Sequence, residues 1–265
     1  MQESDSPMKI CNNCNSPKEA IIEAFGKKLK VPVMCKCEEE KYNQLKEEEE
    51  RKQKIMRLER LRKYSLMDKQ FEQCTFENFE VDESNKQYFN LAKRYVEKFD
   101  EVKSNNLGLL LHGPTGTGKT YLAFCIANEL LNRLVPVIAI SSISLLNRLK
   151  ETYKRYGSEG EIEIINSLKN ASLLVLDDLG AENTTDWAKE KLYEIIDSRY
   201  RDKKPIIITT NLGLDQLKEK LAGSDGIYRT YDRIIEMCTP ILIKGKARRV
   251  ESAKVKQDLL RELLK

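Results

Sequence analysis

A single short motif constrains the fold of this chain more than any other feature. Residues 112–120 read His-Gly-Pro-Thr-Gly-Thr-Gly-Lys-Thr, and from Gly113 onward they fit the pattern G-x-x-x-x-G-K-[ST] at every fixed position. An apolar run, residues 107–111, precedes the motif, and apolar residues at helical spacing follow it between Leu122 and Leu130. The sequence therefore predicts a buried strand, a phosphate-binding loop and the N-terminus of a helix, in that order.

The loop residues are expected to bind the phosphates of a nucleotide such as ATP. Glycines allow the backbone to curl so that successive N–H groups converge on an anion, and the helix dipole adds partial positive charge there. Lys119 would reach the terminal phosphates, and the Thr120 hydroxyl would hold a Mg²⁺ ion. The alternative, a glycine-rich turn without function, is disfavoured by the strand-loop-helix context. The predicted nucleotide-binding residues are Gly113, Pro114, Thr115, Gly116, Thr117, Gly118, Lys119 and Thr120.

Two carboxylates and an amide follow later strand candidates. The apolar run Leu173–Leu176 ends in Asp177 and Asp178, and a further apolar run ends before Asn211. Asp177 is expected to order the Mg²⁺ shell and Asp178 to polarise an attacking water. Asn211 would hold that water or contact the terminal phosphate. The alternatives are a loop cap for the two acids and an ordinary turn for the asparagine.

Five apolar segments are strand candidates, and helical patterns lie between them. Apolar runs without alternation, separated by helices, are typical of a parallel sheet covered on both faces. Ligands of such sheets bind beyond the carboxyl ends of the strands. The sequence thus predicts an α/β fold with a five-stranded parallel sheet between helices. The strand candidates are Leu107–Leu111, Pro136–Ile140, Leu173–Leu176, Ile206–Thr209 and Ile241–Ile243, and the helical stretches include 88–99, Leu145–Tyr156, Ala188–Tyr200 and Leu214–Leu221.

Four cysteines near the N-terminus have the spacing of a metal site. They form two close pairs, Cys11-x-x-Cys14 and Cys35-x-Cys37. Each pair would clip one edge of a tetrahedral Zn²⁺ ion, and the segment from Ala20 to Val33 would form a short hairpin between them. A module this small buries little apolar surface, so the metal would supply folding free energy. We therefore expect a zinc-binding module over residues 1–37, the alternative being four reduced thiols.

A charged segment separates this module from the remainder. Glu47 and Arg51, and Glu48 and Lys52, are pairs at i, i+4 in the orientation that stabilises a helix. The apolar positions do not keep a heptad, so no coiled coil is predicted. We expect a linker helix over residues 38–70 and a nucleotide-binding domain over residues 71–265.

Composition excludes several classes of protein. Charged residues make up 33% of the 265 residues, and no apolar run is long enough to span a membrane. The N-terminus lacks the pattern of a signal peptide, so a cytoplasmic location is expected. The seven cysteines then read as thiols or metal ligands instead of a disulfide framework. The basic end, Lys244–Lys265, would either approach a polyanion or form a solvated terminal helix.

Two arginines lie four residues apart on a predicted helix. Arg229 and Arg233 share one face of it. An arginine delivered to the terminal phosphate of a neighbouring chain stabilises transition-state charge, and this requires an oligomer. The alternative is an ordinary solvated face.

Together these motifs resemble the AAA+ ATPases, and within them the replicative helicase loaders of the DnaC/IstB type. The resemblance covers residues 71–249 and rests on five segments. It implies that Asp177 and Asp178 are the Walker B acids, that Asn211 is the sensor asparagine and that Arg233 is the arginine finger with Arg229 as its companion. The five segments are Thr75–Phe79, Gly113–Thr120, Leu173–Gly180, Ile208–Asn211 and Arg229–Arg233.

The resemblance also implies a function and partners. Such a loader would hydrolyse ATP through Lys119, Asp178, Asn211 and the two arginines, form a nucleotide-dependent homo-oligomer, and deposit a hexameric replicative helicase. It would contact single-stranded DNA through Tyr153, Lys154, Arg155 and Trp187, the alternative being that the two aromatic residues only pack. Rival functions are a transposition helper ATPase, a small-molecule kinase, and an adaptor that binds ATP without turnover.

Overall fold

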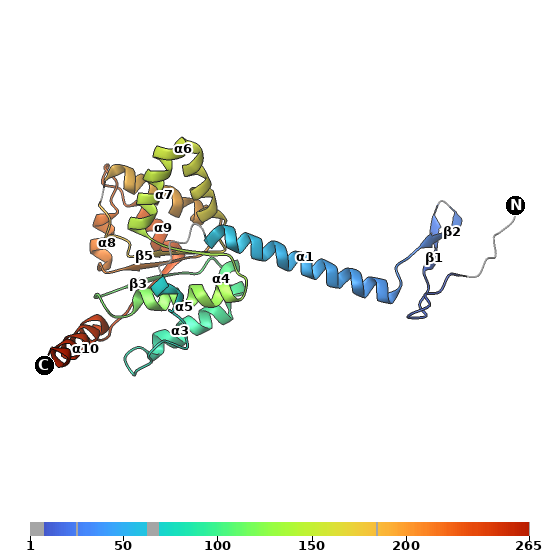
Figure 1. Ribbon diagram of the computed structural model, residues 1–265. Coiled ribbons are helices and arrows are strands. Elements are labelled where there is room, and N and C mark those ends of the chain that lie inside the picture. Colours follow the sequence, from blue (N-terminus) through green and yellow to red (C-terminus); the bar gives the residue numbers. More distant parts are fainter. Residues whose placement is uncertain (1–7, 25, 63–68, 184, 265) are drawn as a thin grey trace. The chain divides into compact units, whose positions relative to one another are not determined.

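The computed structural model of the chain describes residues 8–24, 26–62, 69–183 and 185–264 (Figure 1). The chain divides into two compact units, Met1–Met56 and Arg57–Lys265. Residues 63–68 of the predicted linker lie outside the described residues, and the predicted boundaries after residues 37 and 70 stay predictions.

The first unit contains the expected hairpin. Strands β1 (Glu19–Ala24) and β2 (Lys27–Pro32) pair antiparallel, with Glu19 opposite Pro32 and Ala24 opposite Lys27. Gly26, between the strands, has a φ of +68°, a left-handed conformation that favours glycine in a tight hairpin turn.

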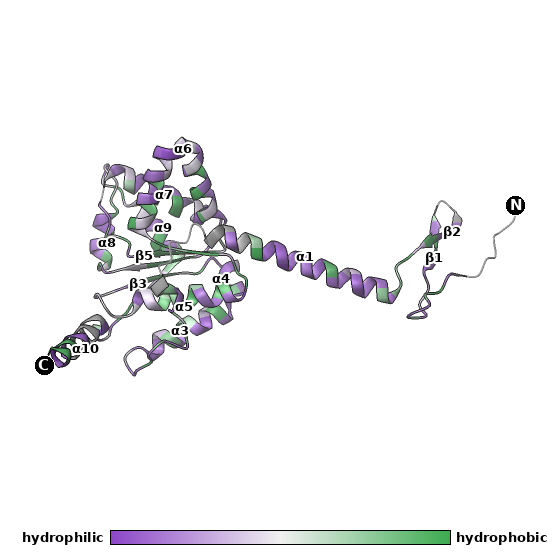
Figure 2. Cartoon of the chain, viewed as in Figure 1, coloured by the Kyte–Doolittle hydropathy of each residue, from purple (hydrophilic) through white to green (hydrophobic). Residues whose placement is uncertain are grey.

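A long charged helix, α1 (Lys36–Arg62), follows the hairpin. It is predominantly hydrophilic (Figure 2), and most of its described side chains are exposed. Its apolar residues do not gather on one face, which agrees with the absence of a heptad in the sequence. A helix of this kind is stabilised by pairs of opposite charge along its surface.

The second unit is built on a five-stranded sheet in which all neighbouring strands are parallel. The strand order is β4-β5-β6-β3-β7, so β3, which leads into the phosphate loop, lies between β6 and β7. The predicted α/β class and the five-stranded parallel sheet are confirmed. The strands are β3 (Gly108–His112), β4 (Val137–Ser141), β5 (Leu173–Asp177), β6 (Ile206–Thr210) and β7 (Cys238–Leu242).

Helices cover both faces of this sheet, as Figure 1 shows. Because successive strand residues point to opposite faces, Leu110 and Leu174 belong to one apolar core while Leu109 and Leu173 belong to the other. The first core is completed by α6 (Ser142–Asn170), α7 (Asp186–Arg201), α8 (Leu214–Lys220) and α9 (Arg229–Met237), and the second by α3 (Lys86–Glu97), α4 (Phe99–Ser104) and α5 (Lys119–Asn132). Burial of each such leucine contributes roughly 1.5–3 kcal/mol.

Two further helices complete the second unit, the short α2 (Lys69–Glu72) and α10 (Arg248–Leu263). Among the described helices, none combines the length and the apolar character that a membrane crossing requires.

The last strand differs from its predicted position. The apolar pattern predicts Ile241–Ile243, whereas β7 runs from Cys238 to Leu242 and includes Pro240. β7 is an edge strand that pairs only with β3, so it tolerates a residue without an N–H and keeps exposed positions. A search for fully apolar runs cannot locate such a strand.

Helix α6 is longer than the predicted Leu145–Tyr156. It begins at Ser142 and reaches Asn170, with a break at Gly157, where φ is 65° and ψ is −150°. The second half returns Ile164, Ile165 and Leu168 to the apolar core. Gly157 therefore redirects the chain and does not end the helical segment.

Candidate nucleotide-binding site

The phosphate loop joins β3 to α5 and depends on glycine at two points. Gly113 has a φ of +132°, and a Cβ atom there would lie 2.7 Å from the carbonyl oxygen of Ile243. Gly118 is the N-cap of α5 and has a φ of +93°. Side chains at these positions would strain the backbone or collide with it. The glycines thus allow the loop to curl directly into the helix N-terminus, where unpaired N–H groups favour an anion.

Lys119, the first residue of α5, is only 5% exposed. Its Nζ donates hydrogen bonds to the carbonyl oxygens of Gly113 at 2.9 Å and Pro114 at 2.7 Å. It also donates to Oδ1 of Asn211 at 2.9 Å. The ammonium group therefore connects the loop with the carboxyl end of β6.

Asp177 ends β5, and Asp178 follows it directly. The Oδ1 atom of Asp177 accepts a 2.6 Å hydrogen bond from the Thr209 hydroxyl, whose oxygen in turn accepts one from the backbone N–H of Asp178 at 2.9 Å. Asp178 has a φ of +55°, in the left-handed region that non-glycine residues seldom adopt. Such strain costs roughly 1–3 kcal/mol and often marks a functional position.

The Asp178 carboxylate is joined to Lys119 through Asn211. The Asn211 Nδ2 group donates to Oδ1 of Asp178 at 2.6 Å, while its own Oδ1 accepts from Lys119. Three residues from three separate segments thus form one hydrogen-bonded chain, which we call the Lys-Asn-Asp chain. The predicted convergence of polar residues at the carboxyl edge of the sheet is observed.

A cavity of 480 Å³ lies against these residues, a volume typical of a small-ligand site. Gly116, Gly118, Thr120 and Asp177 line it together with the Lys-Asn-Asp chain. Other predicted loop residues support the loop from within. Thr117 is buried and donates its hydroxyl to the Pro114 carbonyl at 3.0 Å, whereas Thr115 is exposed.

Part of this cavity has a lining that the sequence did not predict. Phe71 and Phe79 present aromatic surface to it, and Phe71 is itself stacked on Phe124 with ring centroids 4.1 Å apart. Flat apolar surface of this kind suits a nucleobase. The available signal was Thr75–Phe79, one of the five segments that carry the resemblance, which does not show that these aromatic residues lie near the loop. The unpredicted lining residues are Phe71, Cys74, Asn78, Phe79, Glu80, Tyr121 and Arg248.

Arg248 is a second cation at the cavity. Its backbone N–H donates to the Gly116 carbonyl at 3.1 Å, and its Nη2 group donates to Oδ2 of Asp82 at 2.8 Å. The guanidinium carbon lies 5.9 Å from the centroid of the Phe79 ring. The sequence places Arg248 in the basic C-terminal segment and offers no sign that the segment returns to the loop.

The sole histidine precedes the loop. Burial, and then the charge of Lys119, hold the pKa of His112 below its usual 6.5. The local environment therefore disfavours positive charge on this ring when no anion is bound.

The two predicted arginines share α9 and are not among the residues that line the cavity of their own chain. The Nε group of Arg233 donates to Oδ1 of Asp197, and the side chain is 23% exposed. Arg229 is 49% exposed and pairs with Asp225, which lies in the loop before α9, through Nη1 and Oδ2 at 2.5 Å. The arginines thus lie on a surface separate from this nucleotide cavity.

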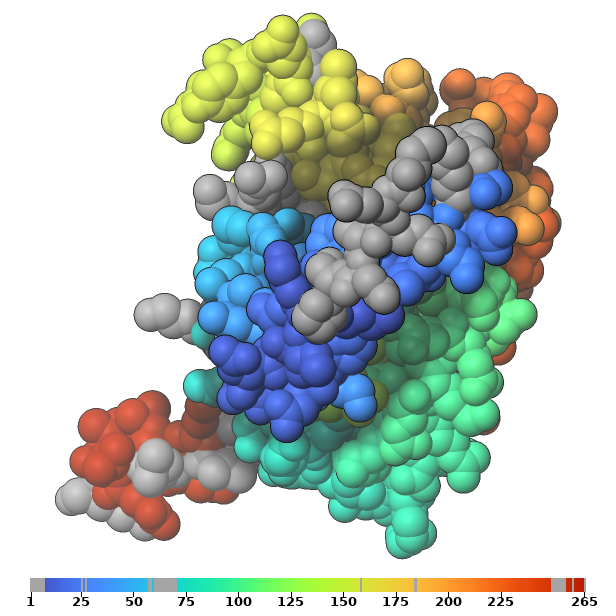
Figure 3. All heavy atoms as spheres, turned by 90° about the vertical axis from the view of Figure 1, so that its right-hand side faces the viewer, coloured from blue at the N-terminus to red at the C-terminus, as the bar shows by residue number. Residues whose placement is uncertain are grey.

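The predicted DNA contacts fall into two groups. Tyr153, Lys154 and Arg155 are all exposed on α6, the yellow-green segment at the edge of the molecule in Figure 3. Trp187 instead packs partly against the apolar core, with the Nζ atom of Lys150 5.1 Å from its ring centroid. The tyrosine ring is thus exposed, whereas most of the tryptophan is engaged in packing.

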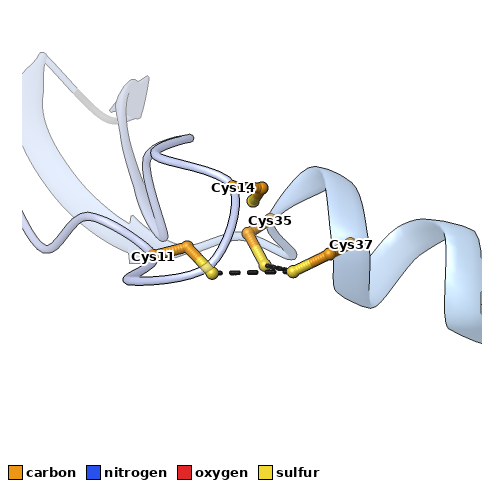
Figure 4. Close-up of side chains that lie close together, drawn as sticks. All are labelled: Cys11, Cys14, Cys35 and Cys37. Atoms are coloured by element: carbon orange, nitrogen blue, oxygen red, sulfur yellow. Dashed lines mark hydrogen bonds between the residues drawn. The ribbon is translucent and has the colours of Figure 1, made fainter.

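The four N-terminal cysteines converge in the first unit (Figure 4). Their Sγ atoms all lie within 4.8 Å of one another, with Cys35 and Cys37 3.2 Å apart and Cys11 and Cys37 3.6 Å apart. A hydrogen bond with the Ser16 hydroxyl lowers the pKa of Cys14 to about 5, and burial raises that of Cys35 to about 12. These four thiols form a group that can hold a metal ion.

Comparison with known proteins agrees with this geometry. The family of IstB-like ATP binding proteins matches residues 26–256. The replicative helicase loader DnaC of Escherichia coli K12 is 32% identical over 186 residues, which cover 70% of this chain and 72% of DnaC. The phage-like element PBSX protein XkdC of Bacillus subtilis 168 is 29% identical over 259 residues, covering 92% of this chain and 86% of XkdC.

A solved structure supports the same assignment. The crystal structure of DnaI superimposes with a TM-score of 0.57 and 28% identity, covering 69% of this chain and 95% of DnaI. The expected resemblance to DnaC/IstB-type AAA+ ATPases is confirmed. The chain, with its phosphate loop, paired acids and five-stranded parallel sheet, belongs to the family of IstB-like ATP-binding proteins.

Proposed function

We propose that this protein hydrolyses ATP to load a hexameric replicative helicase onto single-stranded DNA. The observation that carries the ATPase part is the Lys-Asn-Asp chain, which brings a phosphate-binding cation and a carboxylate together at one cavity. The similarity to the helicase loader DnaC supports the loading part.

The cavity suggests how each group acts on ATP. The loop N–H groups and Lys119 bind the phosphates, and Phe71 and Phe79 flank the base. Lys119 exchanges part of its bonding to loop carbonyls for bonding to phosphate oxygens. Asp178, oriented by Asn211, positions the attacking water and accepts its proton.

Oxygen donors suited to Mg²⁺ lie at the same cavity. Thr120 and Asp177 both line it, and oxygen ligands are those that Mg²⁺ prefers. These two residues would hold the ion, which, when bound, neutralises charge on the phosphates.

The cysteine cluster fits a structural zinc site. A Zn–S distance of roughly 2.3 Å in a tetrahedron places the sulfurs about 3.8 Å apart. The 3.2 Å and 3.6 Å separations are close to that value, and all four sulfurs lie within 4.8 Å of one another. Cys11, Cys14, Cys35 and Cys37 would hold the ion and tie the hairpin to the start of α1. Exposed Ile22 and Leu29, which lie opposite one another on the hairpin, then offer apolar surface to the helicase.

DNA binding and assembly complete the proposal. Tyr153 would stack on a base while Lys154 and Arg155 neutralise phosphates. Arg233, with Arg229 beside it, would reach the nucleotide of a neighbouring copy in a nucleotide-dependent oligomer. The cytoplasmic location expected from the sequence stays a prediction.

A turnover assay tests the central claim. Steady-state ATP hydrolysis is measured with and without a single-stranded oligonucleotide and the replicative helicase of the same host. We expect the rate to rise with both, to vanish in Lys119→Ala, and to persist in Lys103→Ala, an exposed lysine outside the cavity. Stimulation by an acceptor metabolite alone would instead indicate a small-molecule kinase, and binding without turnover would indicate an adaptor.

A transposition helper ATPase is the second candidate. It is favoured by the match to IstB-like proteins over residues 26–256 and by the similarity to a protein of a phage-like element. Capture of interacting proteins from the native host, with and without ATP, distinguishes the two. Recovery of a helicase supports the loader, and recovery of a transposase supports the helper.

A further inference from the structure

Asp197 on α7 is a buried carboxylate shared by two arginines. The residue is 9% exposed. Its Oδ1 atom accepts from Nε of Arg233, and its Oδ2 atom lies 2.8 Å from Nε of Arg201. The side chain of Arg201 is 70% exposed and that of Arg233 only 23%, so the pair with Arg233 is the more shielded from water.

Two aromatic rings flank the same arginine. The guanidinium carbon of Arg233 lies 5.0 Å from the ring centroid of Tyr193 and 5.5 Å from that of Tyr200. Tyr200 is itself fixed, since its hydroxyl donates to Oε1 of Glu236 at 2.7 Å. The rings restrict the plane of the guanidinium group, and the carboxylate restricts its rotation about the side chain.

This arrangement leaves the Nη1 and Nη2 groups of Arg233 available to another ligand. Nη1 of Arg233 makes a long contact of 3.4 Å to the Arg229 carbonyl, and in the described part of the chain no hydrogen bond is found at Nη2. Arg229 lacks this support because its charged partner, Asp225, is 44% exposed. The fixed arginine is therefore Arg233.

We propose that Asp197 is a positioning residue, which holds Arg233 so that its outer N–H groups meet the terminal phosphate of ATP bound to a second copy of the chain. This inference rests on the proposed function. An unsupported arginine must lose rotamer freedom when it meets the phosphate, whereas a clamped one has lost it on folding. The negative charge of Asp197 does not cancel the effect, since Arg201 shares it and the three groups together carry a net charge of about +1.

A mixing experiment tests the delivery of Arg233 by one chain to another. Lys119→Ala supplies Arg233 but has a defective phosphate site, and Arg233→Ala has an intact cavity but no finger. Neither alone should turn over ATP above about a thousandth of the normal rate. Mixed in the presence of single-stranded DNA and helicase, the two should recover turnover at the sites of the Arg233→Ala chains. No recovery would overturn delivery in trans, and with it both the arginine part of the proposed function and this inference.

The role of Asp197 is tested in the same mixture by a further substitution in the chain that donates Arg233, which we call the donor. When the donor carries Lys119→Ala together with Asp197→Asn, recovered kcat should fall about tenfold while KM for ATP is unchanged, because the nucleotide sits on the other chain. Asp202→Asn, at the end of the same helix, is the matched control and should recover turnover in full. Full recovery with the Asp197→Asn donor would overturn the role of Asp197 and leave the proposed function standing.

A second variant separates positioning from folding. Asp197→Glu keeps the charge but moves the carboxylate by one methylene, so the thermal unfolding midpoint should change little while recovered kcat falls.

In an Arg233→Ala chain that hydrolyses its own ATP slowly, Asp197→Asn should lower the rate no further, because Asp197 acts only through Arg233. An additive loss there would overturn the inference.

Discussion

The side-chain amide of Asn211 donates a 2.6 Å hydrogen bond to Oδ1 of Asp178. The same amide group accepts a hydrogen bond from Lys119 on its oxygen, so its two ends are held in opposite directions. An amide is the side chain that meets both demands, because it carries a donor and an acceptor. Asn211 therefore fixes the distance between the cation expected to bind phosphate and the carboxylate expected to act on water.

Replacing Asn211 by Ala should separate binding from hydrolysis. Asp178 would lose its donor while the loop and Lys119 keep their other contacts, so single-turnover hydrolysis should slow by about 10²-fold and the Kd for ATP should change less than about threefold. A fluorescent ATP analogue measures the Kd. Asn105→Ala, at an exposed asparagine that does not line the cavity, is the control and should match the parent protein. An unchanged hydrolysis rate for Asn211→Ala would contradict the role of this residue.

The phosphate loop and the paired acids are predictable from the sequence because the residues that form each of them are adjacent in the chain. A phosphate loop needs glycines, a lysine and a hydroxyl in fixed order, and Asp177 and Asp178 directly follow an apolar strand. Parallel strands then bring their carboxyl ends to one edge, which is how Asn211 could be placed beside Lys119. These inferences require only the spacing of residues and the direction of strands.

The rest of the site depends on tertiary packing that no local pattern encodes. Arg248 reaches the cavity because its backbone binds Gly116, a contact between segments 132 residues apart (248 minus 116). Phe71 reaches it by stacking on Phe124. Likewise, the edge strand β7 contains Pro240 and exposed positions, so an apolar run marks only part of it. Sequence patterns indicate which residues are buried and where turns occur. They do not indicate which distant segments pack against one another, as Arg248 and Phe71 do here.

The single histidine should report the arrival of the nucleotide. Its pKa lies below 6.5 because of burial and the nearby Lys119 charge, and bound phosphates would offset that charge and raise it. NMR titration of the His112 ring, without and with a non-hydrolysable ATP analogue, measures both values. A free-state midpoint at or above 6.5, or a downward shift on binding, would show that the electrostatic description of the loop is wrong.

The same histidine sets a pH dependence of stability. Between its folded pKa and 6.5, the unfolded chain binds more protons at His112 than the folded chain does, so this group lowers the free energy of unfolding as the pH falls through that window. Urea unfolding of the parent and of His112→Gln at several pH values isolates the contribution, since the substitution should reduce the loss. Equal acid sensitivity in the two proteins would contradict it.

The cysteine cluster predicts one bound zinc per chain. Elemental analysis of the purified protein should find about one equivalent, and Cys35→Ser should lose it together with the hairpin, because this residue is fully buried in the cluster. Cys125→Ser is the matched control, since Cys125 lies in the apolar core of the other unit and belongs to no metal cluster among the described residues. Absence of metal from protein purified without chelators would remove the zinc from the proposed function.

Tyr153 should carry base stacking without contributing to the fold. The side chain is 58% exposed on α6, so Tyr153→Ala leaves the core intact and should not lower the unfolding midpoint. Loss of one stacked base costs roughly 1–3 kcal/mol, which is about a fivefold to hundredfold rise in Kd for an oligonucleotide. Lys154→Ala should instead reduce the salt slope by about 0.7. Tyr42→Ala, a 54% exposed tyrosine on α1, is the control in fluorescence anisotropy at matched salt. If Tyr153→Ala and Tyr42→Ala bind the oligonucleotide with the same Kd, the DNA-binding surface lies elsewhere. An exposed ring affects the affinity for DNA only by direct contact, so an unchanged Kd means that Tyr153 does not contact the DNA.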